Sequence, residues 1–171
     1  MAEAEIQDAF MWFEPAGTIK GESQDDALKG KHAFELDDFT VKGENSTNIG
    51  SATKGGGGAG KVKFDRLSLK KRSDSATTGF FLALSTGEHI GDAQIQLRRN
   101  NKPYLIFKFK MCVIAEVETS QSGDDEAEDS IIVDYGSILI EYHQQDTKGA
   151  LKKNQEAKWS RVLNKATDAV T

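Results

Sequence analysis

The first candidate for a chemical site is the glycine-rich stretch at residues 55–61 (GGGGAGK). It satisfies the phosphate-loop pattern G-x-x-x-x-G-K. A phosphate loop also needs Ser or Thr after the lysine for magnesium, a buried strand before it and a helix after it. Here Val62 follows the lysine, the preceding NIGSATK is polar, and a period-two strand pattern follows. The stretch therefore predicts a long polar loop over residues 43–60 rather than a nucleotide site.

The other reactive side chains lack the spacing of a catalytic or metal site. Cys112 is the one cysteine of the chain, so it cannot form an internal disulfide, and its position between Met111 and Val113 is typical of a small apolar filler in a strand. The histidines occur in separate predicted elements, and the serines lack the G-x-S-x-G setting of a hydrolase nucleophile. We therefore expect no enzyme activity, no metal and no cofactor. The side chains considered are His32, His89, His143, Ser68, Ser75 and Ser85.

Length and composition indicate one domain over residues 1–171, in which we expect flexible ends at 1–9 and 160–171. A formal charge of −5 argues against a nucleic-acid partner, which needs clustered Lys and Arg on one face. The first residues lack the basic segment and apolar run of a secretory signal, and no run approaches a membrane span. We expect folding in a reducing cytosol, no membrane insertion, and export, if any, without a signal peptide.

The elements that must position these side chains are strands, interrupted by one short helix over about residues 74–86. Side-chain oxygens before its first turn offer caps, and Gly87 occupies the position of a left-handed stop. Phe80 and Leu84 are the expected core residues of this helix, and we expect Phe81 and Leu82 to be buried as well, because large apolar residues usually are. The candidate caps are Ser73, Asp74 and Ser75, and the apolar stripe is Ala76, Phe80, Ala83 and Leu84.

In three predicted strand regions the alternation of apolar and polar residues shifts by one position. In a flat sheet this shift would place the later apolar side chains on the wrong face. The shifts fall near residues 37–38, between residues 64 and 67, and at residues 136–137. Each requires a β-bulge or a strand that crosses between sheets, so the pattern predicts a mainly β protein, a small β-barrel of two sheets. Residues 105–117, in contrast, alternate without a fault and predict one continuous strand.

Two polar segments complete the pattern. Residues 121–129 (QSGDDEAED) predict an exposed hairpin loop whose like charges keep it solvated. Residues 147–171 predict a polar tail with Trp159, Val162 and Leu163 as its large apolar anchors.

The order of several short motifs between residues 10 and 159 resembles the Hcp family, the haemolysin-coregulated tube proteins of bacterial type VI secretion. These motifs are I-K-G-E-S at 19–23, G-K-V at 60–62, F-x-L at 80–82 and S-T-G-E-H-I-x-x-A at 85–93. The closing strand at 135–145 is similar to the family pattern F-x-x-I-x-x-E-Y-x-P-Q. Each motif is weak alone, and their shared order carries the resemblance.

The resemblance implies a two-sheet β-barrel, six copies closing into a ring, and rings stacking into a tube that a contracting sheath pushes out. Implied partners are copies of the chain itself, the sheath, a spike protein and effector proteins carried in the pore. The implied location is the bacterial cytoplasm, followed by export to the outside or into a target cell. Residues 41–61 would reach a neighbouring ring, unless they are simply a solvated loop. The candidate contacts there are Asn45, Thr47, Asn48 and Lys54.

Two other classes of function stay open on the sequence. A monomeric β-barrel with a ligand or an effector activity would need small or polar inward positions, whereas aromatic side chains are expected to fill this barrel. An enzyme would need residues far apart in the chain to converge on one site. The aromatic residues expected inside are Phe34, Phe64, Phe107 and Phe109.

Overall fold

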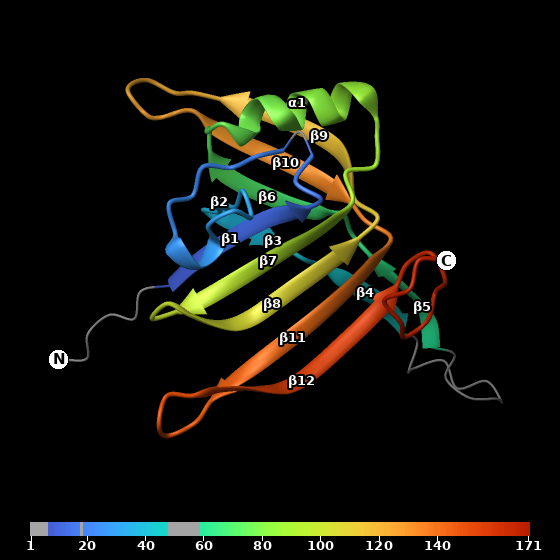
Figure 1. The fold of residues 1–171 in the computed structure, drawn as a ribbon. Helices are drawn as coiled ribbons and strands as arrows, with labels where there is room; N and C mark the ends of the chain where they lie inside the picture. Colours follow the sequence, from blue (N-terminus) through green and yellow to red (C-terminus); the bar gives the residue numbers. More distant parts are fainter. Residues whose placement is uncertain (1–6, 18, 48–58) are drawn as a thin grey trace.

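Antiparallel strands dominate the computed structural model, which describes residues 7–17, 19–47 and 59–171 (Figure 1). A six-stranded sheet has the order β12-β11-β8-β7-β1-β2, a four-stranded sheet has the order β3-β6-β10-β9, and β4 pairs with β5 in a separate ribbon. The early elements are β1 (Gln7–Glu14), the 3-10 turn η1 (Asp26–Leu28), β2 (Phe34–Glu35), β3 (Asp38–Thr40), β4 (Gly43–Thr47), β5 (Ala59–Phe64) and β6 (Leu67–Arg72). The later elements are the helix α1 (Ala76–Thr86), β7 (Asp92–Arg99), β8 (Lys102–Lys110), β9 (Val113–Ser120), β10 (Glu128–Asp134), β11 (Ser137–Gln145) and β12 (Leu151–Ser160).

All three predicted phase changes are places where the chain passes from one sheet to another. β2 lies in the six-stranded sheet and β3 in the four-stranded sheet, β5 lies in the ribbon and β6 in the four-stranded sheet, and β10 and β11 lie in different large sheets. The fold is therefore the predicted small barrel of two sheets. Backbone hydrogen bonds between the described strands of the two large sheets do not close it.

The prediction of one continuous strand over residues 105–117 is wrong. The chain turns at Met111, whose φ is +60°, so β8 ends in one sheet and β9 begins in the other. The core-facing side chains are Phe107 and Phe109 before the turn and Ile114 after it, which reverses the phase. Met111 is consequently 41% exposed rather than buried.

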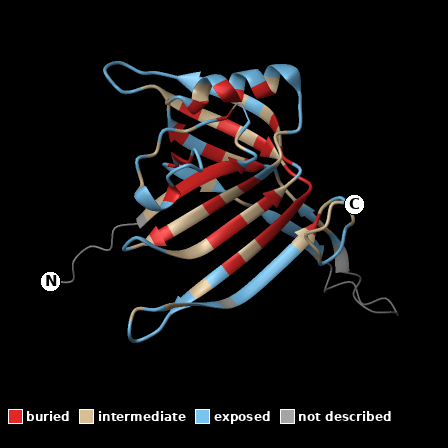
Figure 2. Ribbon diagram, viewed as in Figure 1, coloured by how far each residue is buried: buried red, intermediate tan, exposed pale blue. Residues whose placement is uncertain are grey.

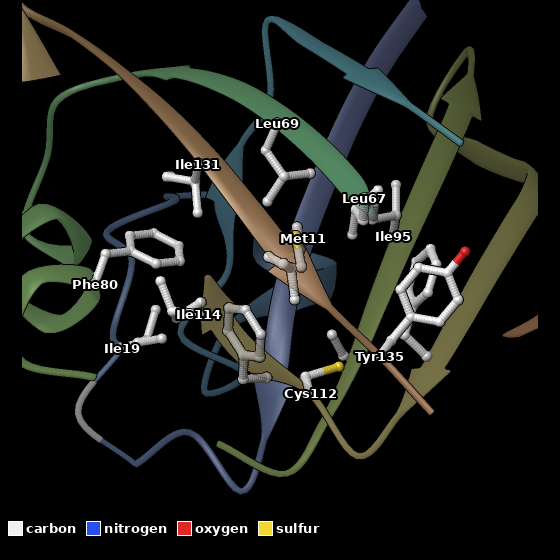
Figure 3. Close-up of a cluster of buried hydrophobic side chains, with 14 of the residues drawn as sticks. Met11, Ile19, Leu67, Leu69, Phe80, Ile95, Cys112, Ile114, Ile131 and Tyr135 are labelled. Carbon is white, nitrogen blue, oxygen red and sulfur yellow. The ribbon is translucent and has the colours of Figure 1, made fainter. Parts of the chain in front are cut away.

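One apolar core fills the space between the two large sheets and α1 (Figure 3). Phe80 is fully buried and packs edge-on against Phe34, with the ring centres 5.6 Å apart, and against Phe13 at 6.0 Å. Burying an aromatic side chain of this kind stabilises the fold by about 1.5–3 kcal/mol. Buried residues alternate along β6 and β10 of the four-stranded sheet, as packing of one sheet face requires, whereas residues 10–13 of β1 in the six-stranded sheet are all buried (Figure 2).

The ends of α1 follow the expected helix chemistry in part. Gly87 ends the helix with φ +65° and donates its N–H to the carbonyl of Ala83, as predicted. At the start, the Ser75 side chain makes no capping hydrogen bond, and Asp74 accepts from the N–H of Ala76 instead.

Both faces of α1 carry apolar side chains, although only one face packs on the core. Phe80 is buried and the half-buried Leu84 packs against the core cluster. The expectation that Phe81 and Leu82 are also buried is wrong, because they are 44% and 50% exposed. At about 100° per residue, Phe81 and Leu82 lie about 100° and 200° around the helix axis from Phe80, away from its core-facing side.

Three other segments differ from the sequence-based prediction. The predicted loop at 43–60 begins and ends in strands, with β4 and β5 paired as a ribbon. Phe64 belongs to this ribbon and covers Gly43 rather than filling the barrel. The predicted polar tail contains β12, which pairs along β11.

Residues 160–171 lie against the corner between β10 and β11. Arg161 donates to the carbonyl of Tyr135 at 2.6 Å, and Ser137 donates to the carbonyl of Asp168 at 2.8 Å. Lys110 forms an ion pair with Asp168 at 2.9 Å. The flexibility predicted for the two ends stays a prediction, and residues 1–6 lie outside the described residues.

Candidate assembly surfaces

The predicted contact residues fall on the ribbon formed by β4 and β5. Asn45 is exposed on β4 and lies opposite Val62 on β5, and the backbone of Thr47 pairs with Ala59. The predicted contacts Asn48 and Lys54 lie outside the described residues. The structure thus places the described part of the predicted contact region on a two-stranded element that belongs to neither large sheet.

Local packing and charge hold the ribbon at its base. A Cβ added at Gly43 would lie 2.8 Å from the Phe64 ring, so a larger residue there would have to displace that ring. Lys42 forms ion pairs with Glu44 at 2.6 Å and with Asp65 at 3.6 Å. The hydrogen bond between Lys42 and Glu44 lowers the pKa of Glu44 and raises the pKa of Lys42. Such a ribbon can offer strand edges and polar side chains to another molecule.

A buried polar cluster, here called the helix latch, fixes α1 on the four-stranded sheet. Asp129 on β10 is fully buried and accepts hydrogen bonds from Ser73 at 2.8 Å, Thr77 at 2.5 Å and Thr119 at 2.7 Å. Lys71 on β6 lies 3.4 Å from the same carboxylate. The latch, which comprises these five residues, therefore joins the start of α1 to β6, β9 and β10.

Charge and burial act in opposite directions on the latch carboxylate. Burial alone raises the pKa of Asp129, but the hydroxyl donors and Lys71 together hold it below its usual value. Lys71 is 1% exposed and also bonds Asp74 at 2.7 Å and the carbonyl of Arg72 at 2.6 Å. The Asp129 carboxylate is therefore favoured in its charged form, and its oxygens and the Lys71 ammonium all have polar partners.

The sequence contains a signal for the latch that the loop prediction for 121–129 passed over. Asp129 shares its strand face with Ile131 and Val133, and Lys71 shares its face with Leu67 and Leu69. A charge at a core-facing position of each strand predicts a buried pair, and the register places Asp129 directly opposite Lys71. Asp129 is thus part of the core and not of the exposed acidic loop.

Besides the ribbon, the outer face of α1 is a second exposed surface. The latch fixes the position of this helix. The helix sequence ATTGFFLALST contains no charged residue, and Phe81 and Leu82 are its exposed apolar side chains. Sequence reasoning missed this surface, although positions one and two residues after Phe80 cannot share its face. An uncharged helix face with two exposed apolar side chains is available to contact another protein.

The side chains first considered for chemistry are placed apart. The residues that follow the glycine-rich stretch form β5 rather than a helix, and residues 48–58 lie outside the described residues. Across the described residues, no group of three or more His, Cys, Asp or Glu side chains could hold a metal ion. Burial raises the pKa of the Cys112 thiol to about 12, so this thiol is unreactive near neutral pH. No helix within the described part of the chain is long and apolar enough to cross a membrane.

Comparisons with known proteins agree with this architecture. Residues 10–142 match a family model described as "Type VI secretion system effector, Hcp". Protein hcp1 of Pseudomonas aeruginosa is 32% identical over 139 residues, covering 78% of this chain and 83% of that protein. The crystal structure of Hcp1 from Salmonella typhimurium is similar with a TM-score of 0.72 and 25% identity, covering 94% of this chain and 99% of the other.

A second solved structure, described as a type six secretion system protein, supports the fold alone. Its TM-score is 0.83 at 24% identity, with 95% of this chain and all of the other chain covered. The match of the family model to most of the chain, together with the identity to the Pseudomonas protein, identifies the chain as a member of the Hcp family of type VI secretion proteins.

Proposed function

We propose that this chain is a structural subunit of the type VI secretion inner tube and has no catalytic role. Six copies close into a ring, rings stack into a tube, and effector proteins travel in its pore. The sheath and the spike protein are the other partners. The chain is made in the bacterial cytoplasm and exported by the type VI system.

The observation that carries this proposal is membership of the Hcp family across residues 10–142. The interior of the barrel supports it, because Phe34, Phe107 and Phe109 fill the space that a ligand-binding barrel would leave open. With a filled interior, the protein acts through its outer surfaces. The helix face with Phe81 and Leu82 is one such surface.

We also propose that the ribbon and the loop it carries contact the neighbouring ring. Asn45, Thr47, Asn48 and Lys54 are the polar contacts of this proposal. Its support is the position of the described part, since Asn45 is exposed on a ribbon separate from both sheets. Deleting residues 55–58 tests it, because the deletion should weaken ring stacking and leave the melting curve unchanged. Unchanged tube formation would contradict this role.

Solution mass tests the ring itself. Light scattering on a sizing column should give about six times the 18.7 kDa of one chain, roughly 112 kDa. Negative-stain images of the same peak should show annular particles. A monomer at micromolar concentration would contradict self-assembly without partners and would favour the alternative, a monomeric barrel that binds a ligand.

A further inference from the structure

A groove opens on the surface where β8 turns into β9. Its volume is about 640 Å³, and its apolar lining includes Met111, Val113, Ala115 and Val162. Met111 is 41% exposed and Val162 is 53% exposed, although both are large apolar side chains. Val113 and Ala115 both line the groove from β9, where Ala115 is the extra residue of a β-bulge opposite Ile132 and Val133. The groove therefore has an apolar floor that water covers in the single chain.

The rim of the groove carries an excess of positive charge. The Arg161 guanidinium lies 2.5 Å from Asp134 and stacks over the Tyr135 ring at 4.6 Å. Arg66 reaches the same carboxylate at 3.5 Å, and its side chain is 58% exposed. Two guanidinium groups thus share one carboxylate, and each has five N–H groups, more than Asp134 and the Tyr135 carbonyl can accept. A fitting occupant is an extended segment with small apolar side chains on one side and carboxylates on the other.

The chain itself contains such a segment before β1. Residues 2–6 read AEAEI, so in an extended conformation Ala2, Ala4 and Ile6 would share one side, and Glu3 and Glu5 the other. We propose that residues 2–6 of a second copy of this chain occupy the groove, with the apolar side on Met111 and Val162 and the glutamates facing the arginines. This inference rests on the proposed self-assembly and names one of its contacts.

The strand register shows why the occupant comes from another copy. β1 runs from Gln7, opposite Arg99, to Glu14, opposite Asp92. The N–H of Met111 bonds the Asp92 side chain, so the groove lies at the Glu14 end of β1. Seven residues of strand separate Gln7 from that end, about 23 Å. Six residues span at most about 20 Å, which is too short to cross the groove of their own chain.

The contact joins different surfaces of two identical chains. Figure 1 shows that β1 begins at one end of the molecule, while β8 passes into β9 toward the opposite end. A head-to-tail contact of this kind leaves a joined pair with one free arm on one copy and one free groove on the other. It therefore propagates into a closed ring or an open stack.

Cross-linking between two variants tests the contact in the full-length protein. A tagged Ala4→Cys chain is co-expressed with an untagged Val162→Cys chain, and the assembled particles are oxidised with diamide. We expect a disulfide dimer of one tagged and one untagged chain on a non-reducing gel. The matched control replaces Val162→Cys with Ser122→Cys on the exposed loop between β9 and β10 and should give no such dimer. Native Cys112 is buried and stays unreacted in both pairs.

Charge reversal tests the polar half of the contact. Arg66→Glu in the Val162→Cys chain should reduce the dimer yield at least tenfold, and Glu3→Lys with Glu5→Lys in the Ala4→Cys chain should restore it. Arg66→Gln provides a milder variant, and its melting curve reports folding. A yield that Arg66→Glu leaves unchanged would overturn the assigned charge contact.

The outcomes separate this inference from the proposed function. Rings that form without the mixed dimer would overturn the inference and leave the tube subunit intact. A disulfide that forms inside one chain carrying both cysteines would contradict exchange between copies. Chains that remain monomeric would overturn the proposed self-assembly and this contact together.

Discussion

The helix latch and the ribbon both depend on lysine–carboxylate pairs, but the two regions place those charges in opposite environments. In the latch, the side chains of Lys71 and Asp129 are each 1% exposed. In the ribbon, the side chains of Lys42 and Glu44 are 55% and 61% exposed at a shorter separation of 2.6 Å. Distance alone would make the ribbon pair the stronger of the two.

Solvent reverses that order of importance. Water and salt screen the exposed pair, and two long side chains lose conformational freedom to hold it. The buried pair has already lost its water, so its remaining partners must satisfy every charged atom. Removing a latch residue therefore leaves unpaired groups inside the protein, whereas removing a ribbon residue returns its partner to solvent.

The largest expected effect is that of Asp129→Ala. The substitution leaves the hydroxyls of Ser73, Thr77 and Thr119 without their acceptor and removes a counter-charge from buried Lys71. We expect the free energy of unfolding to fall by about 3–5 kcal/mol, measured by urea denaturation. Asp124→Ala on the exposed acidic loop is the matched control and should leave the denaturation curve in place. A loss below 1 kcal/mol for Asp129→Ala would contradict the energetic role of the latch.

Lys71→Met should have the next largest effect. In this variant Asp129 keeps its three hydroxyl donors, and Asp74 is partly exposed to water. Fewer buried groups are therefore left without a partner than in Asp129→Ala. We expect a loss of about 1–3 kcal/mol in the same denaturation experiment. The double variant with Lys71→Met and Asp129→Leu should lose less stability than the sum of the losses measured for Lys71→Met alone and Asp129→Leu alone. Strict additivity would show that the two side chains do not act as a pair.

Acid should weaken the latch over the pH range in which Asp129 binds a proton. The pKa of Asp129 lies below its ordinary value of 3.8 in the folded state, so the unfolded chain binds the proton more readily. Its contribution is complete above about pH 4 and is lost as the pH falls toward the folded pKa. Asp129→Asn should therefore show a shallower decline in melting temperature below pH 4 than the unmodified protein. An identical decline in both would contradict the assignment.

The smallest expected effect on folding is that of Glu44→Gln in the ribbon. Its pKa is lowered by the hydrogen bond from Lys42, yet both side chains stay in contact with water. We expect no measurable change in the melting temperature at neutral pH or in its salt dependence. A loss comparable to that of Lys71→Met would remove the distinction between the two regions.

Local pattern by itself determined the helix, its glycine stop and the three crossings between sheets. Gly87 could be recognised because a left-handed residue after an apolar helical stripe strongly favours glycine. The crossings could be recognised because a period-two pattern that changes phase cannot remain in one flat sheet. The family motifs added the expected barrel, and their order along the chain was visible without coordinates.

Only the tertiary structure decided where the chain turns at Met111 and which charges lie inside. The sequence of residues 105–117 alternates as one strand would. The turn at Met111 changes which side chains face the core, but no polar residue in the sequence marks that change. Asp129 followed an acidic loop in the sequence, yet its register opposite Lys71 places both side chains in the core. Such pairs form between residues that are far apart in the chain, and their burial depends on how strands align after folding. The groove beside Met111 exists for the same reason, since its walls come from strands and a C-terminal segment that only the folded chain brings together.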